Sequence, residues 1–361
     1  MESTLSTAQV ELTLSTAQVV PLATFCLVVV IMGLIGNGLV VYSSIRYNAI
    51  QLDRISIVLV RNLAVADMLY TIVVVIPITV TYFAGRYILG DIYCFISAHL
   101  PFIPAGVNFL TVLTITAYRL RVIAFPLRTV SKRSIHLAIL MIWIFAMAGP
   151  AVSLGYKSNF VFAPASAKCF TTIYTNEDAA PLWGTVLILQ TIIPIILITL
   201  FNLVLLLVAY RQKKKHSPNS SVNLKGLVTT LLLSGLFICS VAPFVVFTLL
   251  KGQGIKVSPA MDLMAIHFVF LNVCGNPILY TITNRRFGKY VQDLARKIVF
   301  CGSRIGRGKS TSNFRGILPP VPGLRQPVPV SSCNPPATDT TGSVVEGIAF
   351  GNPTTNQNTV L

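Results

Sequence analysis

Charged residues are scarce in this chain. Asp, Glu, Lys and Arg make up 11% of its 361 residues, whereas 54% are hydrophobic. A soluble domain carries about 25% charged residues, so the composition excludes a water-soluble protein. Acidic residues are the rarest, with 11 Asp and Glu against 28 Lys and Arg and a net charge of +17. In a soluble protein that excess would indicate nucleic acid, but the positions of these charges indicate a membrane and no nucleic-acid partner.

Long stretches without charge account for this composition. In seven of them the length reaches the roughly 20 residues that a helix needs to cross hydrocarbon, and Asp67 is their only Asp, Glu, Lys or Arg. Because lipid offers the backbone no hydrogen bonds, and the alternation of a β-barrel is missing, helices are expected. The sequence predicts an all-α membrane protein, a bundle of seven transmembrane helices at Pro21–Tyr42, Asn62–Gly85, Ile92–Tyr118, Leu137–Tyr156, Ala179–Tyr210, Gly226–Leu250 and Leu263–Asn284.

Basic residues are missing from the first twenty positions and gather in alternate connections. Of the 28 Lys and Arg, 23 lie after spans one, three, five and seven, and five lie in the other connections. Since basic residues stay on the cytoplasmic side, we expect a plasma-membrane protein with its N-terminus outside and its C-terminus inside. Glu2 and Glu11 replace the basic segment of a signal peptide, so span one is expected to anchor the chain.

The segments around the bundle, residues 22–284, have their own composition. Residues 1–21 are expected to be a short, flexible extracellular extension. Residues 285–301 combine apolar and basic positions, which predicts a short amphipathic eighth helix lying on the lipids of the inner leaflet. Its Cys301 is either a palmitoylation candidate or a free thiol. Residues 302–361 are rich in Pro, Ser, Thr and Gly, which predicts a disordered cytoplasmic tail.

The cysteines divide by compartment. Cys94 at the start of span three and Cys169 between spans four and five both lie on the oxidising side, so we predict that they form a disulfide. Cys26, Cys239 and Cys274 lie within spans and are expected to be small packing residues.

Each span carries a short motif or a single characteristic residue. These are Gly36-Asn37, Leu63-Ala64-Val65-Ala66-Asp67, Cys94, Arg119, Trp143, Pro150, Pro194, Pro243 and Asn276-Pro277-Ile278-Leu279-Tyr280, followed by Phe287. Their order and spacing over residues 22–300 resemble the rhodopsin-like (class A) G-protein-coupled receptors. This resemblance implies a receptor that converts binding of an extracellular ligand into guanine-nucleotide exchange on a heterotrimeric G protein.

The resemblance assigns roles to two groups of residues. Asp67 needs polar partners in the membrane, and with Asn108, Asn272 and Asn276 it would form a polar network that holds a sodium ion in the resting state; a neutral Asp67 that only joins helices is the alternative. Nearer the cytoplasm, the residues of G-protein coupling and activation would be Arg119, Tyr118, Pro243, Pro277 and Tyr280.

The chain departs from the family pattern in two respects. The acidic residue before Arg119 is replaced in Tyr118-Arg119-Leu120, and the start of span six has Asn223 and Lys225 in place of an acid. We therefore expect Arg119 to lack its resting-state carboxylate and basal signalling to be raised. In Ser240-Val241-Ala242-Pro243 the Trp usually found two residues before the proline is missing as well. The sequence therefore does not show how ligand binding would be transmitted to span six.

The ligand is constrained mainly by absences. Span seven has no Lys for a retinal Schiff base, and Phe270 occupies that place; Pro101 stands where amine receptors carry an Asp, which argues against a monoamine. The outer half is expected to form an apolar cavity with a few polar groups, and a neutral small molecule, a lipid and a short peptide all remain open. The candidate pocket residues are His99, Phe102, Gln190 and His267.

Other functions fit less well. A transporter would show matching halves or a charged path, and an enzyme would show paired catalytic groups; neither is found, so no enzyme is expected. A decoy or non-signalling receptor is a stronger alternative, given Tyr118-Arg119-Leu120. In the tail, Ser310, Thr311, Ser312 and residues 338–343 could be phosphorylated and bind arrestin, and Thr359-Val360-Leu361 could bind a PDZ domain through Thr359 and Leu361.

Overall fold

The computed structural model describes residues 10–46, 53–125, 130–173, 177–215, 224–252 and 255–305. The chain divides into two compact units, Met1–Leu318 and Pro319–Leu361. All described residues belong to the first unit. The predictions for the tail, including arrestin sites and the PDZ motif ending in Thr359 and Leu361, lie outside the described residues, as does the side chain of Cys301.

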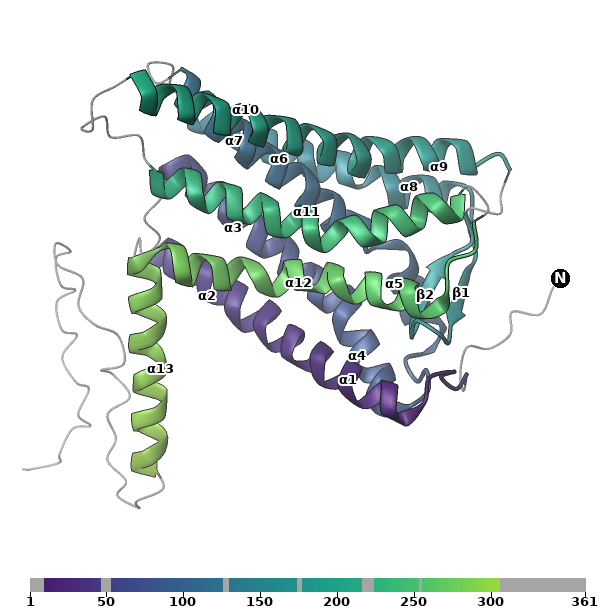
Figure 1. Cartoon of the computed structure of the whole chain (residues 1–361). Helices are drawn as coiled ribbons and strands as arrows, with labels where there is room; N and C mark the ends of the chain where they lie inside the picture. Colours follow the sequence, from purple (N-terminus) through teal and green to yellow (C-terminus); the bar gives the residue numbers. More distant parts are fainter. Residues whose placement is uncertain are drawn as a thin grey trace, which may run out of the picture. The chain divides into compact units, whose positions relative to one another are not determined.

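Within these residues, seven helical spans are long and apolar enough to cross a membrane, which confirms the predicted bundle. In Figure 1 these spans run lengthwise between the two ends of the bundle. Span one joins α1 (Thr16–Ile31), the π-helical turn η1 (Met32–Gly36) and α2 (Asn37–Arg46); span two joins α3 (Arg54–Tyr70), η2 (Thr71–Val75) and α4 (Ile76–Ala84); span three joins α5 (Gly90–His99) and α6 (Phe102–Ala124); span four joins α7 (Lys132–Ala146) and α8 (Ala148–Gly155).

Among the last three spans, six and seven are each a single helix. Span six is the single helix α11 (Leu224–Gly252) and span seven the single helix α12 (Pro259–Thr283), each with a proline inside, Pro243 and Pro277. Span five joins α9 (Ala180–Leu187), η4 (Ile188–Ile192) and α10 (Ile193–Lys215). The amphipathic helix that follows is α13 (Arg285–Ile305), which extends beyond the predicted residue 301.

Capping residues place several helix starts before the predicted spans. The side chain of Asp53 accepts a hydrogen bond from the backbone N–H of Ser56 at the start of α3, and Ser131 and Ser258 do the same for α7 and α12. Caps of this kind satisfy backbone groups that the first turn of a helix leaves open. Hydropathy marks only the part of a helix inside hydrocarbon, so the capped polar ends fall outside it.

The start of α1 corrects the expected flexible extension. The helix begins at Thr16, where the backbone N–H of Ser15 donates to Gln18 Oε1 at 3.1 Å. Ahead of it, the N–H of Leu12 donates to the carbonyl of Gly85, and the N–H of Tyr87 donates to the carbonyl of Val10, both at 3.1 Å. These backbone bonds tie residues 10–15 to the connection after α4.

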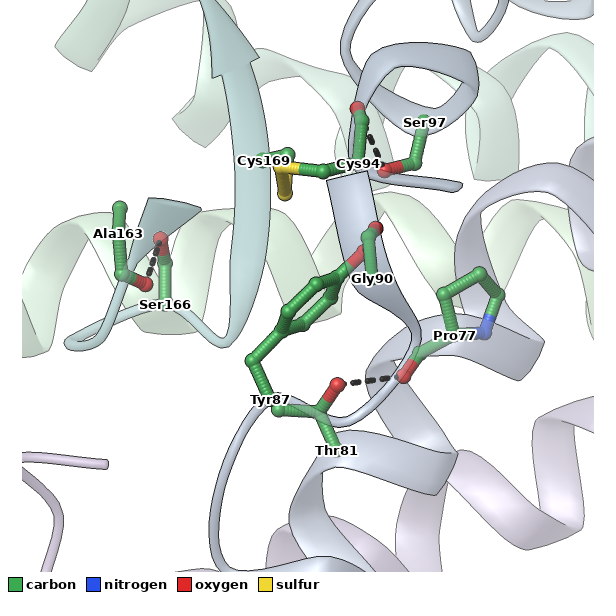
Figure 2. Close-up of a disulfide and its surroundings, with 9 residues drawn as sticks. All are labelled: Pro77, Thr81, Tyr87, Gly90, Cys94, Ser97, Ala163, Ser166 and Cys169. Atoms are coloured by element: carbon green, nitrogen blue, oxygen red, sulfur yellow. Dashed lines mark hydrogen bonds between the residues drawn. A yellow bond between two sulfur atoms is a disulfide. The ribbon is translucent and has the colours of Figure 1, made fainter. Parts of the chain in front are cut away.

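A β-hairpin lies at one end of the bundle (Figure 1). Its strands β1 (Phe160–Ala163) and β2 (Lys168–Thr171) are antiparallel, with Ala163 opposite Lys168. The predicted disulfide is confirmed, because Cys169 of β2 is bonded to Cys94 of α5. Figure 2 shows this bond beside Tyr87, whose hydroxyl donates to the carbonyl of Gly90. We call this end of the bundle the hairpin end.

At the opposite end, called here the α13 end, α13 starts directly after α12 and turns away from its direction (Figure 1). The aromatic ring of Phe287 is buried in the same core cluster as Leu63, Phe109, Phe237 and Tyr280. Spans two, three and seven are more buried than span five, which presents its side chains outward. Asp67, Asn108 and Asn276 lie on these buried spans.

Candidate functional site

Arg119 lies near the end of α6, at the α13 end of the bundle, and its side chain is only 6% exposed. A buried guanidinium needs a negative partner, since an unpaired buried charge is costly. Asp53 supplies it: Arg119 Nη1 lies 3.0 Å from Asp53 Oδ2. The hydroxyl of Tyr118 donates to Asp53 Oδ1 at 2.9 Å. Asp53 therefore contacts both Tyr118 and Arg119, although it precedes them by more than sixty residues.

The carboxylate of Asp53 is held in place by its own helix. It accepts hydrogen bonds from the backbone N–H of Ser56 at 2.9 Å and from the Ser56 hydroxyl at 2.8 Å. Partial burial favours the neutral acid, but the bonds from Ser56, the charge of Arg119 and the bond from Tyr118 outweigh it and hold the pKa of Asp53 below its ordinary value. Asp53 is thus an ionised partner for Arg119 at neutral pH.

This pair corrects the expectation that Arg119 lacks a resting-state carboxylate. The acid is absent from the position before Arg119, but the N-cap residue of α3 provides a carboxylate that contacts the guanidinium. Tyr118, which replaces the usual acid, contributes its hydroxyl to that carboxylate. The reason for expecting raised basal signalling is therefore removed.

The start of α11 lies directly against the same guanidinium. A Cβ atom added to Gly226 would be 3.2 Å from Arg119 Nη1 and 3.3 Å from its Cζ. Such distances are tighter than ordinary contact between side chains, so a glycine lets the backbone of α11 approach Arg119. Tyr280 of α12 is also buried here, and its hydroxyl has no hydrogen-bond partner among the described residues.

Asp67 lies at the middle of the bundle and is completely buried. Its Oδ1 accepts a hydrogen bond from Asn108 Nδ2 at 2.9 Å, and its Oδ2 accepts one from Asn276 Nδ2 at 2.6 Å. These bonds join spans two, three and seven. Asn272 is buried in α12, but within the described part of the chain it makes neither of the bonds to Asp67. Three of the four residues in the predicted network are therefore brought together.

The prolines of spans six and seven lie inside intact helices. Six residues before Pro243, the ring of Phe237 packs edge to face on Phe109 of α6, with 4.9 Å between centroids. Val241 occupies the place where the sequence lacks a Trp and is 3% exposed. Phe237 is thus the aromatic side chain that joins α11 to α6 in this part of the core.

An apolar cavity of about 190 Å³ opens between the spans at the hairpin end. Spans two, three, five, six and seven and strand β2 all contribute to it. Deep in the bundle it is lined by Phe109 and Val241, and nearer the hairpin by Lys168, Phe170 and Thr171. This position and character match the ligand cavity expected from the sequence.

Of the four candidate pocket residues, only Phe102 lines this cavity. His99 Nδ1 is hydrogen-bonded to the Ser153 hydroxyl at 2.7 Å, and Gln190 Nε2 donates a hydrogen bond to the carbonyl of Phe145 at 2.6 Å. His267 Nδ1 is bonded to the carbonyl of Leu263 at 2.7 Å. The structure places these three polar side chains in contacts between and within helices, and they do not line this cavity.

Sequence analysis missed Lys168, which does line the cavity. Its ammonium nitrogen lies 4.1 Å from the ring centroid of Phe170 and 5.8 Å from that of Phe244. Both distances are within the range of a cation–π contact. The position next to the bridged Cys169 was the feature that could have identified it, since the disulfide fixes β2 over the bundle.

The seven spans, the polar network at Asp67, the ion pair of Arg119 and the cavity at the hairpin end define a seven-helix membrane receptor. Residues 36–280 match the family described as 7 transmembrane receptor (rhodopsin family), and the chain belongs to this family. It is a multi-pass rhodopsin-like G-protein-coupled receptor and not an enzyme, as the sequence predicted.

Individual relatives are distant. The chain is 25% identical over 287 residues to the platelet-activating factor receptor of Cavia porcellus, covering 74% of this chain and 83% of the relative. It is 26% identical over 290 residues to cysteinyl leukotriene receptor 2 of Sus scrofa, covering 75% and 80%. The crystal structure of squid rhodopsin has a similar fold, with a TM-score of 0.68 at 17% identity over 80% of this chain and 88% of that one.

Proposed function

We propose that this receptor binds an extracellular ligand in the cavity at the hairpin end and responds by catalysing nucleotide exchange on a heterotrimeric G protein at the α13 end. The proposal places the receptor in the plasma membrane with its N-terminus outside. The distribution of Lys and Arg supports this orientation. So does the disulfide at the hairpin end, because disulfides persist on the oxidising side of a membrane.

The observation that carries the proposal is the buried Arg119, paired with Asp53 and covered by Gly226 of α11. In this arrangement the guanidinium is not accessible to a partner. When α11 moves outward about Pro243, Arg119 and the Tyr280 hydroxyl gain access to the α13 end. The opened groove then accepts an amphipathic helix of the Gα subunit. A ligand drives this change only if it binds the open conformer better than the closed one.

Contacts across the core provide a path from the cavity to α11. Phe109 lines the cavity and also packs on Phe237 of α11. Val241, one turn further along α11, lines the cavity too. A ligand that displaces Phe109 or Val241 therefore acts on the helix that covers Arg119, without the Trp that the sequence lacks.

Replacing Asp53 by Asn tests the resting-state pair. The substitution removes the charge that holds Arg119, and a partly exposed ion pair contributes up to about 1 kcal/mol, so basal exchange should rise up to about fivefold. The measurement is GTP uptake by a panel of purified Gα subunits, with the full-length receptor in lipid discs. Asp293→Asn is the matched control, because Asp293 is an acid of α13 whose only described ion pair, with Arg296, is exposed.

The same assay separates signalling from the non-signalling alternative. A receptor that binds ligand but drives no exchange on any Gα subunit, with or without Asp53→Asn, would be a decoy. Basal exchange that stays unchanged in Asp53→Asn, in a receptor that signals to ligand, would show that the pair with Arg119 does not restrain the resting state.

We also propose that the polar network at Asp67 binds a sodium ion. In support, the Oδ1 of Asn108 is buried and has no hydrogen-bond partner among the described residues, while its Nδ2 is bonded to Asp67. Carboxylate and amide oxygens are suitable ligands for a hard cation. Asp67, Asn108 and Asn276 would hold the ion, with Asn272 as a further candidate, and the ion would supply positive charge that stabilises the closed bundle.

Exchanging sodium for a large organic cation at constant ionic strength tests this site. Basal exchange should rise in the wild type and stay constant in Asp67→Asn, which lacks the charge for the ion. An equal response of both receptors would assign the effect to ionic strength and remove the site.

Arrestin and a PDZ-domain protein are proposed as further partners of the tail. Their support is the sequence alone, namely Ser310 to Ser312 for phosphorylation and Thr359 to Leu361 for the PDZ ligand. Adding one residue after Leu361 should abolish capture of a PDZ partner, because that domain binds the terminal carboxylate.

A further inference from the structure

Three buried polar side chains form a chain of hydrogen bonds beside the ligand cavity. His99 Nδ1 lies 2.7 Å from the Ser153 hydroxyl oxygen, and that oxygen lies 3.0 Å from the Thr171 hydroxyl oxygen. The three residues come from α5, α8 and β2. Of the three, only Thr171 belongs to the described lining of the cavity. The chain therefore joins the wall of the cavity to an imidazole ring behind it.

The second nitrogen of the imidazole ring sets the direction of this chain. His99 Nε2 is buried and has no hydrogen-bond partner among the described residues. A neutral imidazole has one N–H group, which lies on either Nδ1 or Nε2. A hydrogen on Nε2 would leave a buried donor without an acceptor, and such orphaned N–H groups are rarer than acceptors with an unused lone pair. The hydrogen therefore lies on Nδ1, and His99 donates to Ser153.

The remaining hydrogens along the chain determine the state of Thr171. Because the Ser153 oxygen accepts from His99, Ser153 donates its own hydrogen to the Thr171 oxygen. The Thr171 oxygen also accepts from the backbone N–H of Ile173 at 3.3 Å. A hydroxyl group has two lone pairs and one hydrogen, so both lone pairs of Thr171 are occupied. Thr171 has only its hydrogen left to offer, and no described residue accepts it.

Other hydroxyl groups of the lining are already used by the backbone. Ser97 donates to the carbonyl of Cys94 at 3.2 Å, and Tyr87 donates to the carbonyl of Gly90 at 3.1 Å. A polar hydrogen without an acceptor is costly in an apolar cavity. The Thr171 hydroxyl therefore favours a ligand that brings an acceptor to this point of the wall.

We propose that the cavity recognises an oxygen acceptor of its ligand, such as a carbonyl or ether oxygen, through a hydrogen bond that Thr171 donates. His99 and Ser153 act as positioning residues, because they fix which way the Thr171 hydroxyl points. The inference rests on the proposed function and deepens it, since it names the chemical class of the ligand. The cavity volume of about 190 Å³ is below the roughly 300–1,000 Å³ of pockets for drug-sized ligands, so the ligand is small. Its apolar part lies against Phe109 and Val241, deeper in the cavity.

Nitrogen NMR of the full-length receptor, labelled with ¹⁵N in its histidine rings, tests the direction of the chain. The signals of His99 are those that disappear in His99→Asn. His267 is an internal reference, because its Nδ1 bonds the carbonyl of Leu263 at 2.7 Å and must carry a hydrogen to do so. His99 should show the same tautomer, with the hydrogen on Nδ1. A hydrogen on His99 Nε2 alone would reverse the chain and overturn the proposal.

Matched ketones and alkenes test recognition of the oxygen. The probes are acetophenone and cyclohexanone, each paired with the alkene in which a CH₂ group replaces the oxygen, α-methylstyrene and methylenecyclohexane. They are titrated against the receptor in phosphatidylcholine discs without G protein, and the rise in unfolding temperature reports binding. Each affinity is taken as a ratio of wild type to Thr171→Val, in which partition of the probe into the lipid cancels.

Thr171→Val removes the hydroxyl group and keeps the shape of the side chain. At least one ketone should bind this variant about fivefold more weakly than the wild type, as loss of one hydrogen bond predicts. Its alkene should bind both within about twofold, which also shows that the variant is folded. If no ketone binds the wild type better than Thr171→Val, the proposal is overturned.

Further substitutions assign the effect to the chain. Thr191→Val is the matched control, because it removes a hydroxyl group from the same lining outside the chain, and its ketone affinity should stay within about twofold of the wild type. Thr171→Ser should retain most of the affinity. His99→Leu should weaken ketone binding but not alkene binding, and His99→Asn should restore part of it, since its amide N–H can donate to Ser153. Equal losses in Thr191→Val and Thr171→Val would contradict the proposal.

Exchange assays keep this inference separate from the proposed function. A ketone that binds through Thr171, in a receptor that drives no exchange on any Gα subunit with any ligand, would remove the proposed function and leave the ligand class in place. A receptor that signals equally well to its ligand in wild type and Thr171→Val would do the reverse.

Discussion

The two ends of the bundle use positive charge in different ways. At the α13 end the buried Arg119 contacts a carboxylate of the same chain, and the start of α11 covers it. At the hairpin end, Lys168 lies over aromatic rings in an apolar cavity whose described lining has no acid. The charge at the α13 end has a carboxylate partner that stabilises one conformation, whereas the charge at the hairpin end lies within cation–π distance of the rings of Phe170 and Phe244 beside the cavity. The α13 end therefore restrains the receptor, and the hairpin end carries the cavity in which we propose that the ligand binds.

Breaking the disulfide should have the largest effect, and only at the hairpin end. In the Cys94→Ser, Cys169→Ser double variant β2 is no longer bonded to α5, and the loss of such a bond costs about 2–4 kcal/mol of unfolding free energy. The unfolding temperature should fall, and ligand-stimulated exchange should be lost, because β2 contributes to the lining of the cavity. Cys239→Ser is the control, because Cys239 is a free, exposed cysteine. Retained ligand-stimulated exchange would mean that the hairpin ladder alone positions β2 over the cavity.

Phe237→Leu should uncouple ligand binding at the hairpin end from nucleotide exchange at the α13 end. The substitution keeps an apolar side chain in the core but removes the edge-to-face contact with Phe109, worth about 0.5–1.5 kcal/mol. Ligand affinity should stay within about twofold while ligand-stimulated exchange falls several-fold, as measured in parallel on one preparation. Phe268→Leu, at an exposed position of α12, controls for loss of a ring. Equal losses of exchange in both variants would contradict a path through Phe237.

Gly226→Val should weaken the restraint at the α13 end with a smaller effect. The new side chain meets the guanidinium of Arg119 at the first atom beyond the backbone, so α11 must move away. A shift of about 1 kcal/mol toward the open conformer raises basal exchange about fivefold. Gly235→Val is the control in the same helix, where an added Cβ has no neighbour within 4 Å. A silent Gly226→Val receptor with normal ligand response would show that α11 does not restrain Arg119.

The comparison also shows what sequence could and could not predict. The seven spans, the disulfide and the contact of Asp67 with Asn108 and Asn276 were predicted, because hydropathy, compartment and family motifs act over whole spans. The pair of Asp53 and Arg119 was missed, because Asp53 lies ahead of its span and in none of the motifs, so only the fold connects it with Arg119. The N-cap position of Asp53, three residues before Ser56, was its one local feature.

Polar residues inside apolar spans misled the search for a ligand site. His99, Gln190 and His267 stood out because their surroundings are apolar. Each side chain is already hydrogen-bonded, His99 and Gln190 to a group of a neighbouring helix and His267 to a backbone carbonyl of its own helix. Buried polar groups usually have such partners. Lys168 was overlooked because it lies in a connection between spans, where a lysine is usually a solvated charge. Only the disulfide at Cys169 places it over the cavity.

The smallest expected effect is a flat pH response of the ion pair at the α13 end. Because the pKa of Asp53 is below its ordinary value, the pair's contribution is complete above the ordinary carboxyl pKa of about 3.9 and is lost only as the pH falls through the lowered value. The ratio of basal exchange in Asp53→Asn to that in wild type should therefore be constant between about pH 6 and pH 8. A ratio that falls toward one within this window would mean that Asp53 is protonated there. The restraint on Arg119 would then depend on the proton, and the contrast between the two ends would hold only at the higher pH.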